Sequence, residues 1–256
     1  MLTALIHNIQ TADNLLRSAS ALARDLKKEF GVLCYADSED RAKQQQKNID
    51  HYFAENGLEK ARLSVKTHPE KMLADDCDSM DASFLIIQMP DTRRRTIQKY
   101  LNVCRDLRIP YLFFRDEFPV FDFSKVMLPV GFLVEELEKA QFASAFGRFC
   151  RSEILLLLAN DYGSKAATNA GKMKELFDKF DFRYMQEKAS TDSFSVEKEA
   201  VARAQREGYG VVIISASRDY GLDDLLLGPK ELHLVRKSTV PLLLVNPRGD
   251  LYTLCD

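Results

Sequence analysis

The residues best suited to chemistry lie in the segment 210–246, in a loop between two short apolar runs. The runs 211–214 and 242–245 are rich in Val, Ile and Leu and predict buried parallel strands, with a helix beginning just after residue 228. Glycines allow close backbone approach, and the start of a helix offers free N–H groups, so such a loop is a candidate phosphate site. Its candidate residues are Ser215, Ser217, Arg218, Gly221, Gly228 and Pro229.

The same segment resembles a known family. The block LLLG at 225–228, the block VPLLLV at 240–245 and their spacing from Ser215 look like the carboxy-terminal signature of the universal stress protein family. The resemblance implies a Rossmann-like fold. In that family, nucleotide-binding members carry G-x-x-G, nine residues and then G-[S/T] at this place.

Three of the four phosphate-handling positions of that pattern are changed in this chain. The first glycine falls on Ser215, the second on Arg218 and the third on Gly228, and the final hydroxyl residue falls on Pro229. Proline suits the first position of a helix but offers neither an N–H nor a side-chain donor. We therefore expect the loop to keep its helix and to lose phosphate contacts.

Other residues near the predicted site also depart from the family pattern. The acidic residue that follows the family's first strand falls on Gly131 in the second half and on His7 in the first. Asp223 and Asp224 lie in the loop itself, and a carboxylate about 6 Å from a phosphate costs up to about 3 kcal/mol at an effective dielectric near 20. As an alternative, Arg218 would hold a phosphate through its own guanidinium group.

The order of predicted elements repeats along the chain. Apolar strands alternate with amphipathic helices through residues 1–115 and again through 125–256. The pattern predicts an α/β fold of two tandem Rossmann-like units, each a five-stranded parallel sheet flanked by helices. In the terms of the resemblance, these are two units of the adenine nucleotide alpha hydrolase-like type. The first half is the more diverged, because Gln88-Met89-Pro90 stands where its glycine loop would begin.

A proline precedes the last predicted strand of each half. Pro110 and Pro241 suit the first residue of a strand, because proline cannot donate to the hydrogen-bonded ladder. An apolar edge strand invites pairing unless it is covered. From the resemblance, we expect strand 111–114 (Tyr111 to Phe114) and strand 242–245 (Leu242 to Val245) to lie together in an internal pseudo-dimer. Whether two chains then form a homodimer stays open.

Composition limits the classes of function. The chain has 256 residues, 46% hydrophobic residues and a formal net charge of -2, so it has no bulk attraction for nucleic acid or anionic lipid. No apolar run reaches the roughly 20 residues that cross a bilayer, and no signal peptide is apparent. We expect a cytoplasmic protein with no membrane partner. The five widely spaced cysteines predict reduced thiols: Cys34, Cys77, Cys104, Cys150 and Cys255.

Metal and nucleic-acid sites find little support. The four histidines are scattered and form no i, i+4 pair, and the acidic residues 75–81 lack the glycine and the final glutamate of a calcium loop. The basic run 93–95 is typical of an exposed first turn of a helix, although a nucleic-acid or acidic partner is the alternative. No nucleophile motif is present, so we expect no catalytic residues, no metal and no enzyme.

The resemblance and the altered loop together predict a non-catalytic stress-response protein. Its nucleotide pocket would be degenerate, with no required cofactor, and it would act by binding a small ligand or a protein partner. The alternative is an ATP-binding universal stress protein, with or without slow hydrolysis, that uses Arg218 and Gly228. The ligand, the partner and the inducing stress are open at this point.

Overall fold

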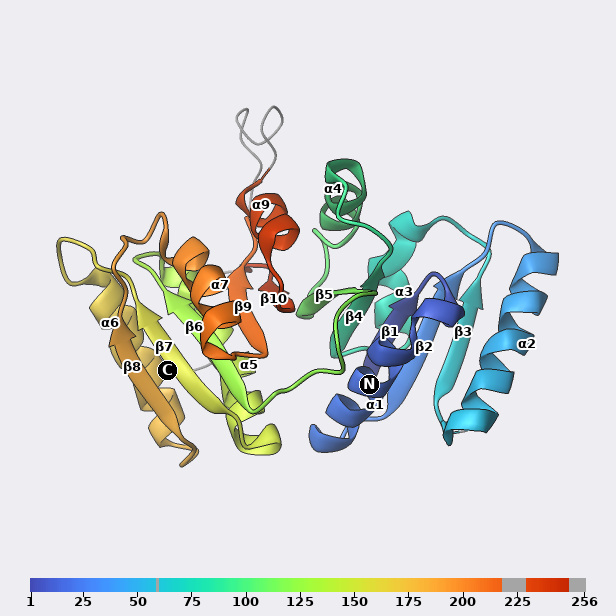
Figure 1. Cartoon of the computed structure of the whole chain (residues 1–256), viewed down its shortest axis with the longest axis horizontal. Coiled ribbons are helices and arrows are strands. Elements are labelled where there is room, and N and C mark those ends of the chain that lie inside the picture. The colour runs from blue at the N-terminus through green and yellow to red at the C-terminus, as the bar shows by residue number, and fades with distance from the viewer. Residues whose placement is uncertain (59, 218–228, 249–256) are drawn as a thin grey trace. The chain divides into compact units, whose positions relative to one another are not determined.

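The computed structural model describes residues 1–58, 60–217 and 229–248, which form two compact units. Unit 1 spans residues 1–121 and unit 2 spans residues 122–256 (Figure 1). Each unit is an α/β sandwich around its own run of five parallel strands, as the sequence predicted. The predicted pairing of strand 111–114 with strand 242–245 remains a prediction.

Unit 1 has the strand order β3-β2-β1-β4-β5. Its strands are β1 (Leu2–Ile6), β2 (Phe30–Tyr35), β3 (Arg62–Lys66), β4 (Phe84–Met89) and β5 (Tyr111–Arg115). Its helices are α1 (Asp13–Asp25), α2 (Glu39–Asn56), α3 (Leu73–Ser79) and α4 (Arg94–Val103), with 3₁₀ turns at Ile9–Thr11 and Glu70–Met72.

Unit 2 repeats this arrangement with the strand order β8-β7-β6-β9-β10. Its strands are β6 (Lys125–Val130), β7 (Glu153–Leu158), β8 (Tyr184–Lys188), β9 (Val211–Ser215) and β10 (Leu242–Val245). Its helices are α5 (Glu138–Ala145), α6 (Lys165–Asp178), α7 (Val196–Glu207) and α9 (Lys230–Lys237), with a 3₁₀ turn at Val134–Leu137 and a π turn at Phe146–Cys150.

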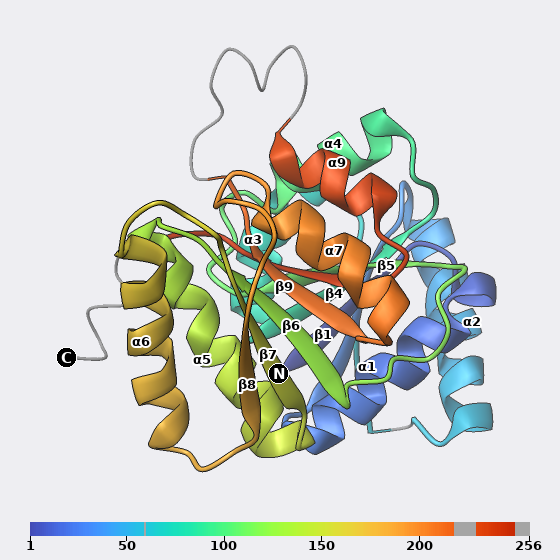
Figure 2. The same ribbon diagram turned by 60° about the vertical axis from the view of Figure 1, so that its left-hand side comes forward.

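The helices divide between the two faces of each sheet. Right-handed crossovers place α5 and α6 on one face of the unit 2 sheet and α7 and α9 on the other, as Figure 2 shows. The central strands β4 and β9 are buried along their whole length, which explains the apolar runs 84–87 and 211–214 within them. The strands β3 and β8, at the far ends of these two orders, are half-buried to exposed and correspondingly polar.

Local signals fix the ends of several helices. The Ser38 side chain accepts a hydrogen bond from the Arg41 N–H at the start of α2, and Gly57 ends the same helix with a left-handed φ of 68°. The segment 134–150 is divided into a 3₁₀ turn, α5 and a π turn. The π turn includes Gly147, where an added Cβ would lie 2.4 Å from the Phe182 ring.

Cys34 and Cys77 carry free thiols, as predicted. Cys34, Cys77 and Cys104 are buried and Cys150 is partly buried, whereas Cys255 lies outside the described residues. No helix in the described ranges combines the length and apolar character needed to cross a membrane.

Gly210 marks a close approach of two backbones before β9. A Cβ at this position would lie 1.6 Å from the Asp122 carbonyl oxygen, so any side chain here would have to displace the backbone at Asp122. We expect Gly210→Ala to lower the free energy of unfolding by about 2 kcal/mol or more. Gly171→Ala is the matched control, because its added methyl meets nothing within 4 Å in α6 and should stabilise by about 0.5–1 kcal/mol. Urea unfolding of both variants checks this, and equal effects would contradict it.

Candidate functional site

In each unit the candidate site lies at the carboxyl ends of the central strands. The connections leave β1 and β4 in opposite directions in unit 1, and leave β6 and β9 likewise in unit 2. Such a switch point leaves a crevice between the loops, where open α/β sheets bind their ligands. The predicted residues Gly131 and Ser215 lie here, at the ends of β6 and β9.

A buried ion pair, formed by Glu136 and Lys139, lies next to Gly131 in unit 2. The Glu136 carboxylate accepts a hydrogen bond from the Gly131 N–H at 3.3 Å and contacts the Lys139 ammonium at 2.5 Å. Lys139 is fully buried and also donates to the Pro129 carbonyl oxygen at 2.7 Å. The Gly131 N–H, which follows β6, is therefore already hydrogen-bonded to the Glu136 carboxylate.

Gly131 has little room for a side chain. A Cβ at Gly131 would lie 3.1 Å from Ser193 Oγ and 3.8 Å from the carboxyl carbon of Glu136. An aspartate at 131 would thus place a second carboxylate beside the first, in a buried setting. A glycine at position 131 therefore leaves the buried carboxylate of Glu136 without a like charge beside it.

A second carboxylate accepts a hydrogen bond from the backbone N–H at the end of β9. Glu197, in the first turn of α7, accepts the Ser215 N–H at 3.1 Å and contacts Lys230 Nζ at 2.9 Å. Ser215 Oγ is buried and has no hydrogen-bond partner in the part of the chain that the structure describes. The position of the first signature glycine is thus occupied by a serine whose amide is already satisfied.

A third carboxylate accepts a hydrogen bond from a backbone N–H in the loop that follows β9. Glu231, in the first turn of α9, accepts hydrogen bonds from the N–H of Ser217 and from its hydroxyl, the latter at 2.9 Å. Glu231 is fully buried. Pro229 precedes α9 with extended backbone and makes no side-chain cap, so the helix begins one residue later than predicted, at Lys230.

Burial and charge set the protonation of these groups. Burial raises the pKa of the Glu231 carboxyl, although the hydrogen bonds from Ser217 and the Lys230 charge partly offset it. Desolvation alone would lower the pKa of the Lys230 ammonium, but the carboxylates of Glu197, Glu136 and Glu231 together raise it above its usual value. Lys230 is therefore a permanent cation at this rim.

The remaining predicted residues, Arg218, Gly221 and Gly228, lie outside the described residues. Among the predicted site residues that are described, Gly131, Ser215 and Ser217 each have their backbone N–H bonded to an internal carboxylate.

Unit 1 satisfies the equivalent groups with a neutral side chain. Gln88, at the end of β4 and 1% exposed, accepts hydrogen bonds through Oε1 from the N–H groups of His7 and Asn8, at 2.7 and 3.0 Å. Its Nε2 donates to Thr11 Oγ1 at 2.9 Å and to Asp116 Oδ1 at 2.8 Å. Gln88 thus ties the loop after β1 to the segment after β5.

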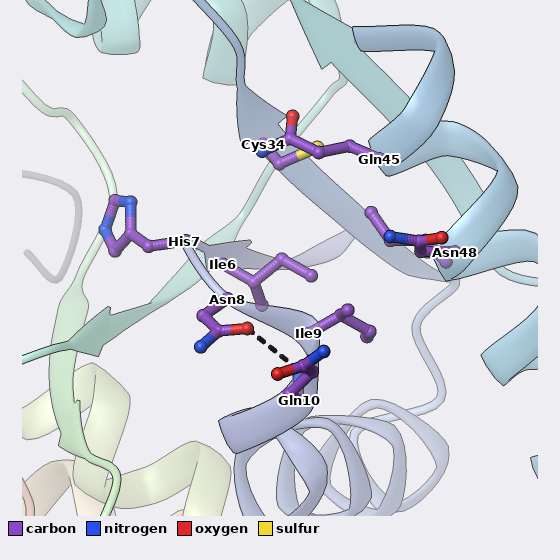
Figure 3. A pocket seen from close by; sticks show the side chains of 9 residues that line it. Ile6, His7, Asn8, Ile9, Gln10, Cys34, Gln45 and Asn48 are labelled. Carbon is purple, nitrogen blue, oxygen red and sulfur yellow. Dashed lines mark hydrogen bonds between the residues drawn. The ribbon is translucent and has the colours of Figure 1, made fainter. Parts of the chain in front are cut away.

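A small polar pocket remains beside this loop in unit 1 (Figure 3). It has a volume of about 150 Å³, and Gln10, Cys34, Gln45 and Asn48 help to line it. Gln45 Oε1 is buried there without a hydrogen-bond partner among the described residues. The volume corresponds to a single small ring or a few water molecules, since water occupies about 30 Å³ in the liquid.

The imidazole ring of His7 points away from the polar side chains of this pocket. Figure 3 shows the imidazole directed away from Gln45 and Asn48. Its Nε2 lies 2.8 Å from the Tyr100 hydroxyl, and its Nδ1 lies 3.8 Å from the Glu70 carboxylate. Burial lowers the pKa of His7 in spite of Glu70, so the imidazole is held neutral at neutral pH.

The described residues offer little for nucleophilic or metal chemistry. Burial raises the pKa of the Cys34 and Cys77 thiols to about 12, so both are protonated at neutral pH. Within the described ranges, no group of three His, Cys, Asp or Glu side chains is placed to hold a metal ion.

The sequence did not reveal what fills the crevice. Glu197 and Glu231 lie in the first turns of their helices, where acidic residues are ordinary and usually exposed. One signal was available for Gln88, because a glutamine at the end of an otherwise apolar strand is unusual and needs buried partners.

Comparisons with known proteins agree with this fold. No protein-family model and no curated protein matches the sequence. The structure is similar to a universal stress protein from Archaeoglobus fulgidus, with a TM-score of 0.68 and 12% identity over 97% of each chain. A Pseudomonas aeruginosa structure that carries the universal stress protein name gives a TM-score of 0.66 and 13% identity, over 99% of this chain and 95% of that one.

A third similar structure is the cytoplasmic domain of a prokaryotic cation chloride cotransporter. Its TM-score is 0.57, with 13% identity over 98% of each chain. At these identities the likeness is one of fold. The predicted fold, that of the tandem universal stress proteins, is confirmed.

Glu231 gives a test of the buried carboxylate. A carboxyl whose folded pKa is raised stabilises the fold most below its unfolded pKa of about 4.3, and this contribution is lost as the pH rises through the folded pKa. Glu231→Gln removes the charge and should therefore raise the melting temperature, relative to the native chain, more at pH 7 than at pH 4.5.

Glu207→Gln is the control with the opposite sign. A hydrogen bond from Arg203 lowers the pKa of Glu207, so its contribution is present above its unfolded pKa and is lost as the pH falls. This variant should lose more stability at pH 7 than at pH 4.5. Thermal unfolding across this pH range measures both, and a Glu231→Gln difference that does not change with pH would contradict the burial of an ionisable carboxyl.

Proposed function

We propose that this chain is a non-catalytic stress-response protein of the tandem universal stress protein type, with a degenerate nucleotide pocket. It acts by binding a small ligand or a protein partner. The observation that carries the proposal is that Glu136, Glu197 and Glu231 accept the backbone N–H groups of the unit 2 crevice.

The electrostatics of the crevice support the loss of triphosphate binding. A phosphate and a carboxylate about 6 Å apart repel by about 3 kcal/mol at an effective dielectric near 20, and three carboxylates are present. Lys139 is already paired with Glu136, and Lys230 with Glu197. A polyphosphate would have to displace these internal carboxylates before it could accept a hydrogen bond from any of the three N–H groups.

The fold itself is compatible with a binding role. One similar structure is the cytoplasmic domain of a prokaryotic cation chloride cotransporter, so this architecture also occurs as part of a transport protein. The alternative for this chain is an ATP-binding protein, with or without slow hydrolysis, that uses Arg218 and Gly228.

Equilibrium titration with a fluorescent ATP analogue separates the two functions. We expect no saturable binding at micromolar concentrations by the native chain. Saturable micromolar binding that Arg218→Ala abolishes would defeat the proposal and support the alternative.

Removing one internal carboxylate should restore part of the lost affinity. Glu197→Ala frees the Ser215 N–H and the Lys230 ammonium together, so we expect the affinity for the ATP analogue to rise about tenfold or more. Glu207→Ala is the charge-matched control on the same helix, outside the crevice, and should leave affinity unchanged. An equal rise in both variants would show that net charge, and not the freed amide, controls binding.

A further inference from the structure

A second and larger hollow lies in unit 2, beside the loops that follow β6, β7 and β8. Its volume is about 740 Å³, within the range of roughly 300–1,000 Å³ that small-molecule sites occupy. It does not use the amides of Ser215 and Ser217, and its lining combines aromatic rings with carboxylates.

Three aromatic side chains from three different loops line this hollow: Phe132, Tyr162 and Phe194. Phe194 is 80% exposed and Tyr162 is fully exposed, so these two rings contribute little to the core. The ring centroids of Phe132 and Phe194 lie 5.4 Å apart with their planes at 67°. Exposed aromatic rings gathered at one concave place indicate an interaction site more strongly than scattered ones do.

Aromatic rings attract cations to their faces. Elsewhere the chain supplies such cations itself, as where the Arg148 guanidinium lies 3.9 Å from the centroid of Phe180 and Lys99 Nζ lies 5.1 Å from that of Tyr100. Within the described ranges, no lysine or arginine lies over Phe132 or Phe194.

Two carboxylates are fixed at the same hollow. Asp161 accepts the Ser193 N–H at 2.8 Å and also the Ser193 hydroxyl, and Asp192 accepts the Phe194 N–H at 3.1 Å. Each carboxylate retains free lone pairs, because an ionised carboxylate accepts about four hydrogen bonds. With Lys165 as the one cationic residue among those that line the hollow, the lining carries a net negative charge.

We propose that this hollow binds a small organic cation of the alkylated ammonium class. The rings of Phe132, Tyr162 and Phe194 would contact the alkyl groups, while Asp161 and Asp192 supply the opposite charge. A free anion fits the site poorly because of the two carboxylates. A bare metal ion would leave the exposed rings without a role.

The probe for this proposal is choline, compared with its uncharged carbon analogue, in which a tert-butyl group replaces the trimethylammonium group. The two have the same shape, so only the charge differs. In titrations of the full chain followed by amide chemical shifts, choline should shift residues 160–165 and 192–194 and saturate. The carbon analogue should bind at least about tenfold more weakly.

Variants then assign the site. Phe194→Ala removes an exposed ring, and Asp192→Asn removes a charge while keeping an acceptor for the Phe194 N–H. Each should weaken choline binding about tenfold. Leu133→Ala is the matched control, since Leu133 is an exposed neighbour of Phe132 that does not line the hollow, and it should leave affinity unchanged.

Two results would overturn the proposal. Equal affinity for choline and its carbon analogue would reduce the hollow to an apolar surface, and the absence of shifts in these loops at high choline concentration would exclude the site. The inference gives the ligand-binding part of the proposed function a chemical class. The hollow and the crevice use different side chains. If choline fails to bind, the ATP titration therefore still tests the proposed function independently.

Discussion

The structure depends on how it satisfies the backbone N–H groups at the carboxyl ends of its central strands. Buried amides need partners, and a Rossmann-like crevice normally leaves some of them for a bound phosphate. Here side chains of the protein accept them: Gln88 in unit 1, and Glu136, Glu197 and Glu231 in unit 2. The crevice is thus stable without a ligand, and the same hydrogen bonds that complete the fold oppose anion binding.

The two units solve this problem with different chemistry. A neutral amide in unit 1 both donates and accepts, and it leaves a small polar pocket beside Gln45 and Asn48. Carboxylates in unit 2 require cations nearby, which Lys139 and Lys230 provide. Burying these charges is tolerated because each one is paired or hydrogen-bonded. The two units thus share a fold but differ in the side chains that line the carboxyl ends of their central strands.

Much of the fold could be predicted from the sequence, because it rests on local patterns. Apolar runs marked the central strands. The candidate site was predicted only in position: Gly131 and Ser215 do lie at the crevice. Its occupants were missed, because whether a first-turn glutamate such as Glu231 is buried depends on tertiary packing. The aromatic hollow was missed for a related reason, since Phe132, Tyr162 and Phe194 are far apart in sequence and meet only through the sheet.

The central claim is that internal carboxylates already hold the amides of the unit 2 crevice. The most direct test follows the backbone ¹H–¹⁵N signals of Gly131, Ser215 and Ser217 while Mg·ATP is added to the native chain. The account predicts that these three signals keep their positions up to millimolar nucleotide. Saturable shifts at Ser215 and Ser217 would contradict it, because they would show that a phosphate displaces Glu197 and Glu231 from these amides.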